Sequence, residues 1–175
     1  MAAKLYGADN APLKIQFITD PHYYSRKGGT EGKAYEKAEA KSQKIIKDSD
    51  LVIKAGFDLL CADTSTDIVV LAGDTTRDAE FIEMLRDLKK RGKRVYVITA
   101  THDYRDGGVA DGYDGDKKIQ VPAVEERHDL WQMYYEFGPN EAIATHPDSM
   151  SYVVQLAPGY RLFALNDDTN YKPEG

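Results

Sequence analysis

The chain has 175 residues, the size of one ordinary domain, and we expect a single domain over residues 1–175. Its 42% hydrophobic and 30% charged residues exclude a collagen, a coiled coil and a disordered tail. The net charge of −6 argues against non-specific nucleic-acid binding, and no apolar run approaches the about 20 residues of a membrane helix. The lone Cys61 excludes an internal disulfide and is expected to be a buried apolar filler.

The first half of the chain predicts two strands separated by a helix. Residues 13–19 are β-prone and stop at Asp20, and a glycine-rich loop follows. From residue 34 to 62, small and apolar residues recur at helical period, which predicts one long helix that Gly56 either breaks or brings close to a sheet. Residues 67–72 are almost continuously apolar, as in a strand that is covered on both faces.

A second helix and a third strand come next. Asp78 is placed to cap a helix that ends at Gly92 and has the apolar stripe Phe81, Ile82, Leu85 and Leu88. Residues 94–100 form the third predicted strand. The acidic, glycine-rich stretch 101–121 is expected to be a mobile lid or a solvated loop, since it lacks the spacing of a calcium-binding EF-hand.

The last part predicts a helix and a hairpin. Residues 124–137 read as an amphipathic helix with Leu130, Trp131, Tyr134 and Tyr135 on its apolar side. Residues 151–157 and 161–166 are two strands joined at Pro158-Gly159. The predicted fold class is therefore α/β, with at least three parallel strands and a terminal hairpin.

Residues that bind metal or move protons follow each of the first three strands. They are Asp20 and His22, then Asp74 after Gly73, then His102-Asp103. Ligands in open α/β sheets sit at the carboxyl ends of the strands, so these three loops are expected to converge. Carboxylates and imidazoles without thiolates suit Mn, Fe, Zn or Ni. Gly73 is expected to let the backbone turn sharply, so that the carboxylate of Asp74 faces the ion.

In this order the three segments resemble the first three blocks of the calcineurin-like metallophosphoesterases, which run D-x-H, G-D-x-x and G-N-H-D/E. The matching segments are F-I-T-D-P-H-Y (17–23), L-A-G-D-T-T-R-D (71–78) and V-I-T-A-T-H-D (97–103). The resemblance extends to the strands at 151–153 and 162–166, and so spans nearly the whole chain. It implies the α/β/β/α sandwich of that family, of which this chain would form the N-terminal part.

The resemblance also implies a reaction. Asp20 and His22 would hold the first of two divalent metal ions, and Asp74 would bridge both. His102, oriented by Asp103, would protonate the leaving group while a metal-bridging hydroxide attacks the phosphorus of a phosphomonoester or phosphodiester. Arg77 and Tyr23 are candidate substrate contacts, with ordinary surface side chains as the equal alternative.

The chain departs from the family's pattern in two places. Ala100-Thr101 stands where the family has Gly-Asn, so the second metal would have only the weak hydroxyl ligand of Thr101. The lone His and the G-H-x-H block that complete both metal sites in the family have no counterpart here. His128 and His146 precede the hairpin and are interpreted as solvated. The alternative function is therefore a degenerate, non-catalytic chain that acts in binding or assembly.

Further expectations follow from the same features. With part of the ligand set, metal affinity is expected to be weak. The C-terminal hairpin is expected to leave Val153, Leu162 and Ala164 poorly covered beside an unpaired strand edge. The chain is therefore expected either to self-associate through this hairpin or to be a marginally stable fragment of a longer protein. The first ten residues show no signal peptide, so a cytoplasmic location is the default, with an exported domain whose signal has been removed as the alternative.

Overall fold

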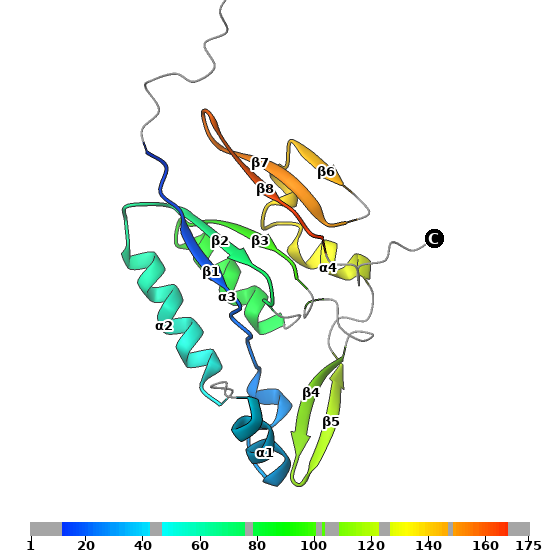
Figure 1. Cartoon of the computed structure of the whole chain (residues 1–175). Coiled ribbons are helices and arrows are strands. Elements are labelled where there is room, and N and C mark those ends of the chain that lie inside the picture. Colours follow the sequence, from blue (N-terminus) through cyan, green and yellow to red (C-terminus); the bar gives the residue numbers. More distant parts are fainter. Residues whose placement is uncertain are drawn as a thin grey trace, which may run out of the picture.

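The computed structural model describes residues 12–42, 47–75, 79–100, 103, 109–122, 127–146 and 149–167. Within these ranges the chain forms a mixed α/β structure with one parallel sheet, one antiparallel sheet and a separate β-hairpin (Figure 1). The α/β class predicted from the sequence is confirmed at this level.

Three parallel strands form the first sheet in the order β1-β2-β3. They are β1 (Gln16–Thr19), β2 (Ile68–Ala72) and β3 (Arg94–Ile98). The central strand β2 is buried along four of its five residues, as its continuous apolar run predicted. Because all three strands run in the same direction, the segments that follow them leave the sheet at the same end, where the carboxyl ends of the strands lie.

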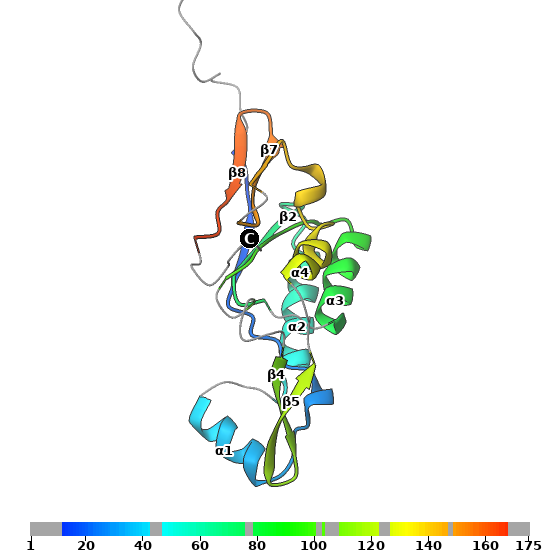
Figure 2. The same ribbon diagram turned by 90° about the vertical axis from the view of Figure 1, so that its right-hand side faces the viewer.

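Helices cover one face of this sheet. These are α2 (Ser49–Ala62), α3 (Ala79–Lys90) and α4 (Arg127–Tyr134), and Figure 2 shows them together on one side of the strands. The predicted stripe of α3 is buried against Val69, Leu71, Val95 and Val97 of the sheet in one hydrophobic cluster. Helix α3 stops before Gly92, whose φ of 91° is the left-handed conformation expected of a terminating glycine.

A second sheet covers the other face. It contains β6 (Ala144–His146), β7 (Ser151–Ala157) and β8 (Tyr160–Ala164) in antiparallel order. Tyr152, Val154, Leu156 and Ala164 pack on Ile68, Val70 and Tyr96 of the parallel sheet. The described residues thus build three layers, helices, parallel sheet and antiparallel sheet, with one core in each gap (Figure 2).

The prediction of one helix over residues 34–62 is wrong, because the structure divides this stretch into α1 (Lys33–Ser42) and α2, with a turn at Lys47-Asp48 before α2. Gly56 breaks neither helix: it lies inside α2, and a Cβ there would meet no atom within 4 Å. Cys61 is partly exposed on α2, where it packs at the margin of the core.

The stretch expected to be a lid or solvated loop contains a hairpin of β4 (Val109–Asp114) and β5 (Lys117–Pro122). Its two-residue turn is Gly115-Asp116, with Gly115 at φ 56°. Such a turn needs a positive φ, and Gly-Asp is a known signal for it. The sequence therefore contained a hairpin signal, which the acidic and glycine-rich composition of the stretch obscured.

The β4–β5 hairpin packs with α1 and the short 3₁₀ helix η1 (Arg26–Gly28) as a lobe beside the sheets (Figure 1). Tyr24, Tyr35 and Tyr113 form its aromatic centre. The ring centroid of Tyr113 is 6.3 Å from that of Tyr24 and 5.6 Å from that of Tyr35. Gly29 has a φ of 87°, and a Cβ there would lie 2.0 Å from the carbonyl oxygen of Tyr113. Only glycine permits this close approach of the two segments.

The expectation about the C-terminal hairpin is partly wrong. Ala164 is buried and Leu162 is half-buried because both pack in the core between the two sheets, and Val153 is half-buried as well. The exposed apolar residues are instead Phe163 and Leu165, at 59% and 67%. Strand β8 pairs only with β7 among the described strands.

Two smaller points concern helices. Leu130 and Tyr134 of α4 are buried as predicted, whereas Tyr135 lies in the turn that follows α4 and is exposed. Across the described part of the chain, every helix is too short or too polar to cross a membrane.

Candidate metal centre

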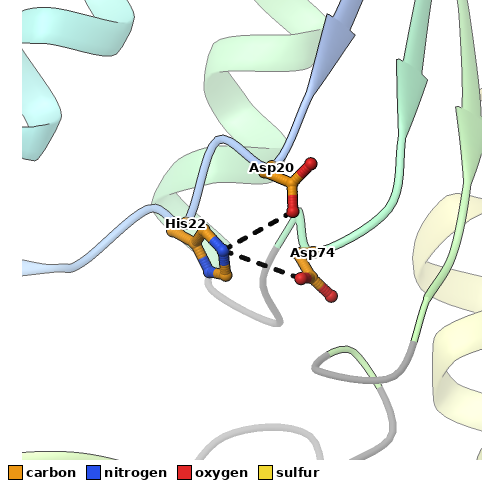
Figure 3. A group of neighbouring side chains, drawn as sticks. All are labelled: Asp20, His22 and Asp74. Carbon is orange, nitrogen blue, oxygen red and sulfur yellow. Dashed lines mark ion pairs between the residues drawn. The ribbon is translucent and has the colours of Figure 1, made fainter. Parts of the chain in front are cut away.

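Three of the predicted ligands meet at the carboxyl edge of the parallel sheet. Asp20 and His22 lie in the segment directly after β1, and Asp74 follows β2 after one glycine. Figure 3 shows the three side chains turned toward one another. One ligand atom from each lies within 4.8 Å of the other two. The predicted convergence of Asp20, His22 and Asp74 is therefore confirmed.

The spacing of the three side chains suits an ion between them. The Nε2 atom of His22 is 3.7 Å from Oδ1 of Asp20 and 3.6 Å from Oδ2 of Asp74. These separations exceed an ordinary hydrogen bond of about 2.7–3.2 Å. Metal–ligand bonds of about 2.1 Å place neighbouring ligand atoms roughly 3–3.5 Å apart, so a small contraction would form a site.

All three residues have left-handed backbone conformations. The φ angles are 51° for Asp20, 43° for His22 and 50° for Asp74. A non-glycine residue held this way costs on the order of 1–3 kcal/mol and persists only where the surroundings enforce it. Strain of this kind clusters at functional sites, and here it coincides with each member of the candidate centre.

Gly73 is needed at the end of β2 for two reasons. Its φ is 75°, and a Cβ at this position would lie 2.6 Å from Cβ of Ala100. Its N–H donates to the carbonyl oxygen of Ile98 at the end of β3, over 2.7 Å. The sharp turn predicted at Gly73 is present, and it brings the loop of Asp74 against the end of the third strand.

Access to the centre is uneven. The side chain of Asp20 is 62% exposed, that of His22 is 27% exposed and that of Asp74 is 15% exposed. Asp20 is thus the most exposed of the three side chains and Asp74 the least exposed. Two carboxylates and an imidazole supply hard oxygen and borderline nitrogen donors, which suit Mn, Fe, Zn or Ni.

Asp103 belongs to a buried polar network beside this centre. Its Oδ2 accepts the backbone N–H of Ala100 and its Oδ1 accepts the hydroxyl of Thr75, each over 2.9 Å. The Thr75 hydroxyl is also 2.9 Å from the hydroxyl of Tyr134 on α4. Asp103 and Thr75 have no exposed surface. This network fixes the turn after β3 to the residue that follows Asp74.

Tyr23 is buried in the helix-side core, with its ring centroid 5.6 Å from that of Phe81. Its hydroxyl donates to Oε2 of Glu80 over 2.8 Å. The alternative that Tyr23 is an ordinary surface side chain is therefore wrong, and its observed contact is with α3. The other candidates for catalysis and binding, Arg77, Thr101 and His102, lie outside the described residues.

The two remaining histidines are distant from these loops in the chain. His128 lies in α4, and its side chain is outside the described part of the structure. His146 is the last residue of strand β6; it is exposed, as expected, and its Nδ1 is 3.1 Å from Oγ of Ser149. Within the described ranges, Asp20, His22 and Asp74 are the residues that gather at metal-binding distance.

Sequence reasoning missed Thr75, Tyr134 and Glu80. Thr75 and Tyr134 are buried hydroxyls that contact each other across 59 positions of sequence, and no local pattern signals such a pairing. Glu80 lies in the first turn of α3, where an acidic residue is ordinary for helix-dipole reasons. Its contacts with residues 23–27 depend on the tertiary fold.

Neither a protein-family model nor a curated protein matches this chain. The geometry of the centre therefore stands on its own.

Proposed function

We propose that this chain is a metal-dependent phosphoesterase of the calcineurin-like kind, acting on a phosphomonoester or a phosphodiester. The observation that carries the proposal is the convergence of Asp20, His22 and Asp74 within 4.8 Å at the ends of two adjacent parallel strands. The order of the D-x-H and G-D blocks along the chain supports the same family.

The donor set fits a divalent transition metal. Asp20, His22 and Asp74 would hold it through carboxylate oxygens and the Nε2 atom of the imidazole, which faces both carboxylates. A protein that supplies three ligands leaves coordination positions for water or substrate, as catalytic sites do. When bound, divalent ions supply Lewis acidity, neutralise phosphate oxygens and lower the pKa of bound water.

The chain's own residues would orient the ester and move a proton. We assign His102 as the proton donor to the leaving-group oxygen. The support comes from its neighbour Asp103, whose carboxylate ties the turn after β3 to Ala100 and Thr75. Thr75 directly follows Asp74, and His102 directly precedes Asp103 in the chain, so Asp103 is tied to the residue next to the proposed metal ligand. Arg77, three residues after Asp74, is our candidate for phosphate binding.

The layer arrangement also supports the family proposal. A parallel sheet with helices on one face and an antiparallel sheet on the other is three of the four layers of the α/β/β/α sandwich. Thr101 in place of the family's Asn gives a weaker second site, so we propose one principal metal position at Asp20, His22 and Asp74.

Hydrolysis assays test this function directly. The full chain, stripped with chelator and then supplied with Mn²⁺, is assayed on p-nitrophenyl phosphate and bis(p-nitrophenyl) phosphate. Activity is expected with at least one ester and is expected to disappear in Asp74→Asn. Asp67→Asn is the matched control, because Asp67 is exposed and immediately precedes β2, at the strand end away from Asp74. A chain that binds Mn²⁺ but hydrolyses neither ester would favour the non-catalytic alternative.

A further inference from the structure

The segment that follows His22, residues 23–27, makes polar contacts with two helices, α3 and α2. Tyr23, Ser25 and Lys27 all turn to Glu80 in the first turn of α3. The hydroxyls of Tyr23 and Ser25 donate to Oε2 of Glu80 over 2.8 and 2.7 Å. The Nζ atom of Lys27 is 2.5 Å from Oε1. One carboxylate therefore binds every second residue of the segment.

The intervening residues turn to α2. The backbone N–H of Tyr24 donates to Oγ of the buried Ser49 over 2.8 Å, and the guanidinium of Arg26 donates to the carboxylate of Asp50 over 3.1 Å. One of these contacts is made by the main chain of Tyr24 and the other by the side chain of Arg26, at the start of η1. The segment thus runs between the N-terminal turns of α2 and α3.

Glu80 is the shared acceptor of this arrangement. Its three donors lower the pKa of its carboxyl group from 4.5 to about 2, with the contacts to Lys27, Ser25 and Tyr23 as the main causes. The carboxylate is therefore ionised at neutral pH. The ring of Tyr23 is held against Phe81, the residue after Glu80, so that its hydroxyl is aimed at the carboxylate.

The first residue that contacts Glu80, Tyr23, directly follows His22, whose backbone conformation is strained. His22 has a φ of 43°, and such a conformation persists only when its neighbours enforce it. Releasing residues 23–27 would let His22 relax to a common backbone conformation and swing its imidazole away from Asp20 and Asp74.

We propose that Glu80 is a positioning residue of the metal centre, which holds the segment 23–27 so that His22 keeps its metal-binding orientation. This inference rests on the proposed metal binding by Asp20, His22 and Asp74. The contacts described for Glu80 are with residues 23–27, so its proposed role is exerted through the segment that it binds.

Metal affinity of the full chain tests this role. Glu80→Ala removes the acceptor for all three donors, and Glu80→Gln keeps a carbonyl oxygen but loses the charge. Mn²⁺ affinity is measured by calorimetry well below the melting temperature of each variant. Loss of supporting contacts around a metal ligand typically costs about 10–100-fold in affinity, so Glu80→Ala is expected to bind at least about tenfold more weakly. Glu80→Gln is expected to lie between Glu80→Ala and the unmodified chain.

Glu83→Gln is the matched control, since Glu83 lies one turn later on α3 and pairs with Arg86 instead of the segment. It is expected to leave Mn²⁺ affinity unchanged. If Glu80→Ala does not melt cooperatively, Glu80→Gln carries the test alone. Equal affinity of the Glu80 variants and the unmodified chain would overturn the positioning role while leaving the proposed function standing. An unmodified chain that binds no Mn²⁺ would overturn both.

Discussion

The backbone N–H of His22 donates to the carbonyl oxygen of Asp74 over 3.1 Å. The two loops that carry the candidate ligands are thus joined through their main chains, in addition to the 3.6 Å approach of their side chains. This bond connects a segment after β1 to a segment after β2, and both residues that form it have left-handed conformations. A metal site needs ligands that their surroundings hold in place, and this bond is one such constraint on the proposed centre.

The stability of the chain is expected to depend on pH through the ionisation of the Glu80 carboxyl group. Its folded pKa of about 2 lies below the ordinary value of 4.5, so the unfolded chain binds the proton more readily. The stabilisation is therefore complete above about pH 4.5 and is lost as the pH falls toward about 2. The melting temperature of the unmodified chain should exceed that of Glu80→Gln by a constant margin above pH 5, narrowing below about 4.5. A margin that does not change with pH would contradict this account of Glu80.

Two glycine substitutions should have opposite effects on stability. Gly29→Ala forces a Cβ against the carbonyl oxygen of Tyr113 at a φ of 87°, and is expected to cost at least about 1–3 kcal/mol. Gly56→Ala is the matched control, because it lies in α2 with open space around the added Cβ and should stabilise by about 0.5–1 kcal/mol. Urea unfolding of the three chains measures both values. Equal effects would mean that Gly29 does not pack on the hairpin.

Removal of the Thr75 hydroxyl should destabilise the loop of Asp74. Thr75→Val keeps the shape of the side chain, but the carboxylate of Asp103 and the hydroxyl of Tyr134 each lose a buried hydrogen-bond partner. The expected cost is about 1–3 kcal/mol of unfolding free energy. Thr75→Ser retains the hydroxyl and should cost less. If Thr75→Ser costs more unfolding free energy than Thr75→Val, the hydrogen bonds of the Thr75 hydroxyl contribute less to stability than its methyl group.

We propose that the C-terminal hairpin associates with a second copy of the chain along β8. Phe163 in β8 and Leu165 just after it are exposed, and β8 pairs only with β7 among the described strands. Light scattering at micromolar concentration should give a mass above the 19.6 kDa of one chain. The double substitution Phe163→Gln with Leu165→Gln should lower the measured mass to that of one chain. Leu59→Gln, on the exposed side of α2, should leave the mass of the assembly unchanged. A monomeric unmodified chain would contradict the proposal.

The part of the fold that was predictable depends on local apolar pattern. The runs in β2 and α3 are long and periodic, so their burial followed from the sequence. The convergence of Asp20, His22 and Asp74 followed from the parallel order of the strands. The break between α1 and α2 did not, since the small and apolar positions keep a helical period across it.

The contacts that hold the centre in place were beyond the sequence for a different reason. Glu80 meets the segment after His22 across more than fifty positions, and Thr75 meets Asp103 across 28. Such contacts arise when separate elements pack, and neither residue type marks them in advance. The positive φ of His22 was likewise not predictable, since histidine is enriched in that region but a non-glycine residue adopts it in only a few per cent of cases.

The most direct test of the account is a calorimetric titration of the full chain with Mn²⁺ after removal of bound metal by chelation. We expect one principal ion to bind, weakly because three protein ligands leave the remaining positions to water. Loss of a supporting contact typically weakens metal binding about 10–100-fold, and Asp74→Asn should weaken Mn²⁺ binding by more than that because it alters a ligand. Asp67→Asn should leave Mn²⁺ affinity unchanged. Tight binding of two ions would contradict the predicted weakness, and no binding, or binding indifferent to Asp74→Asn, would contradict the metal centre itself.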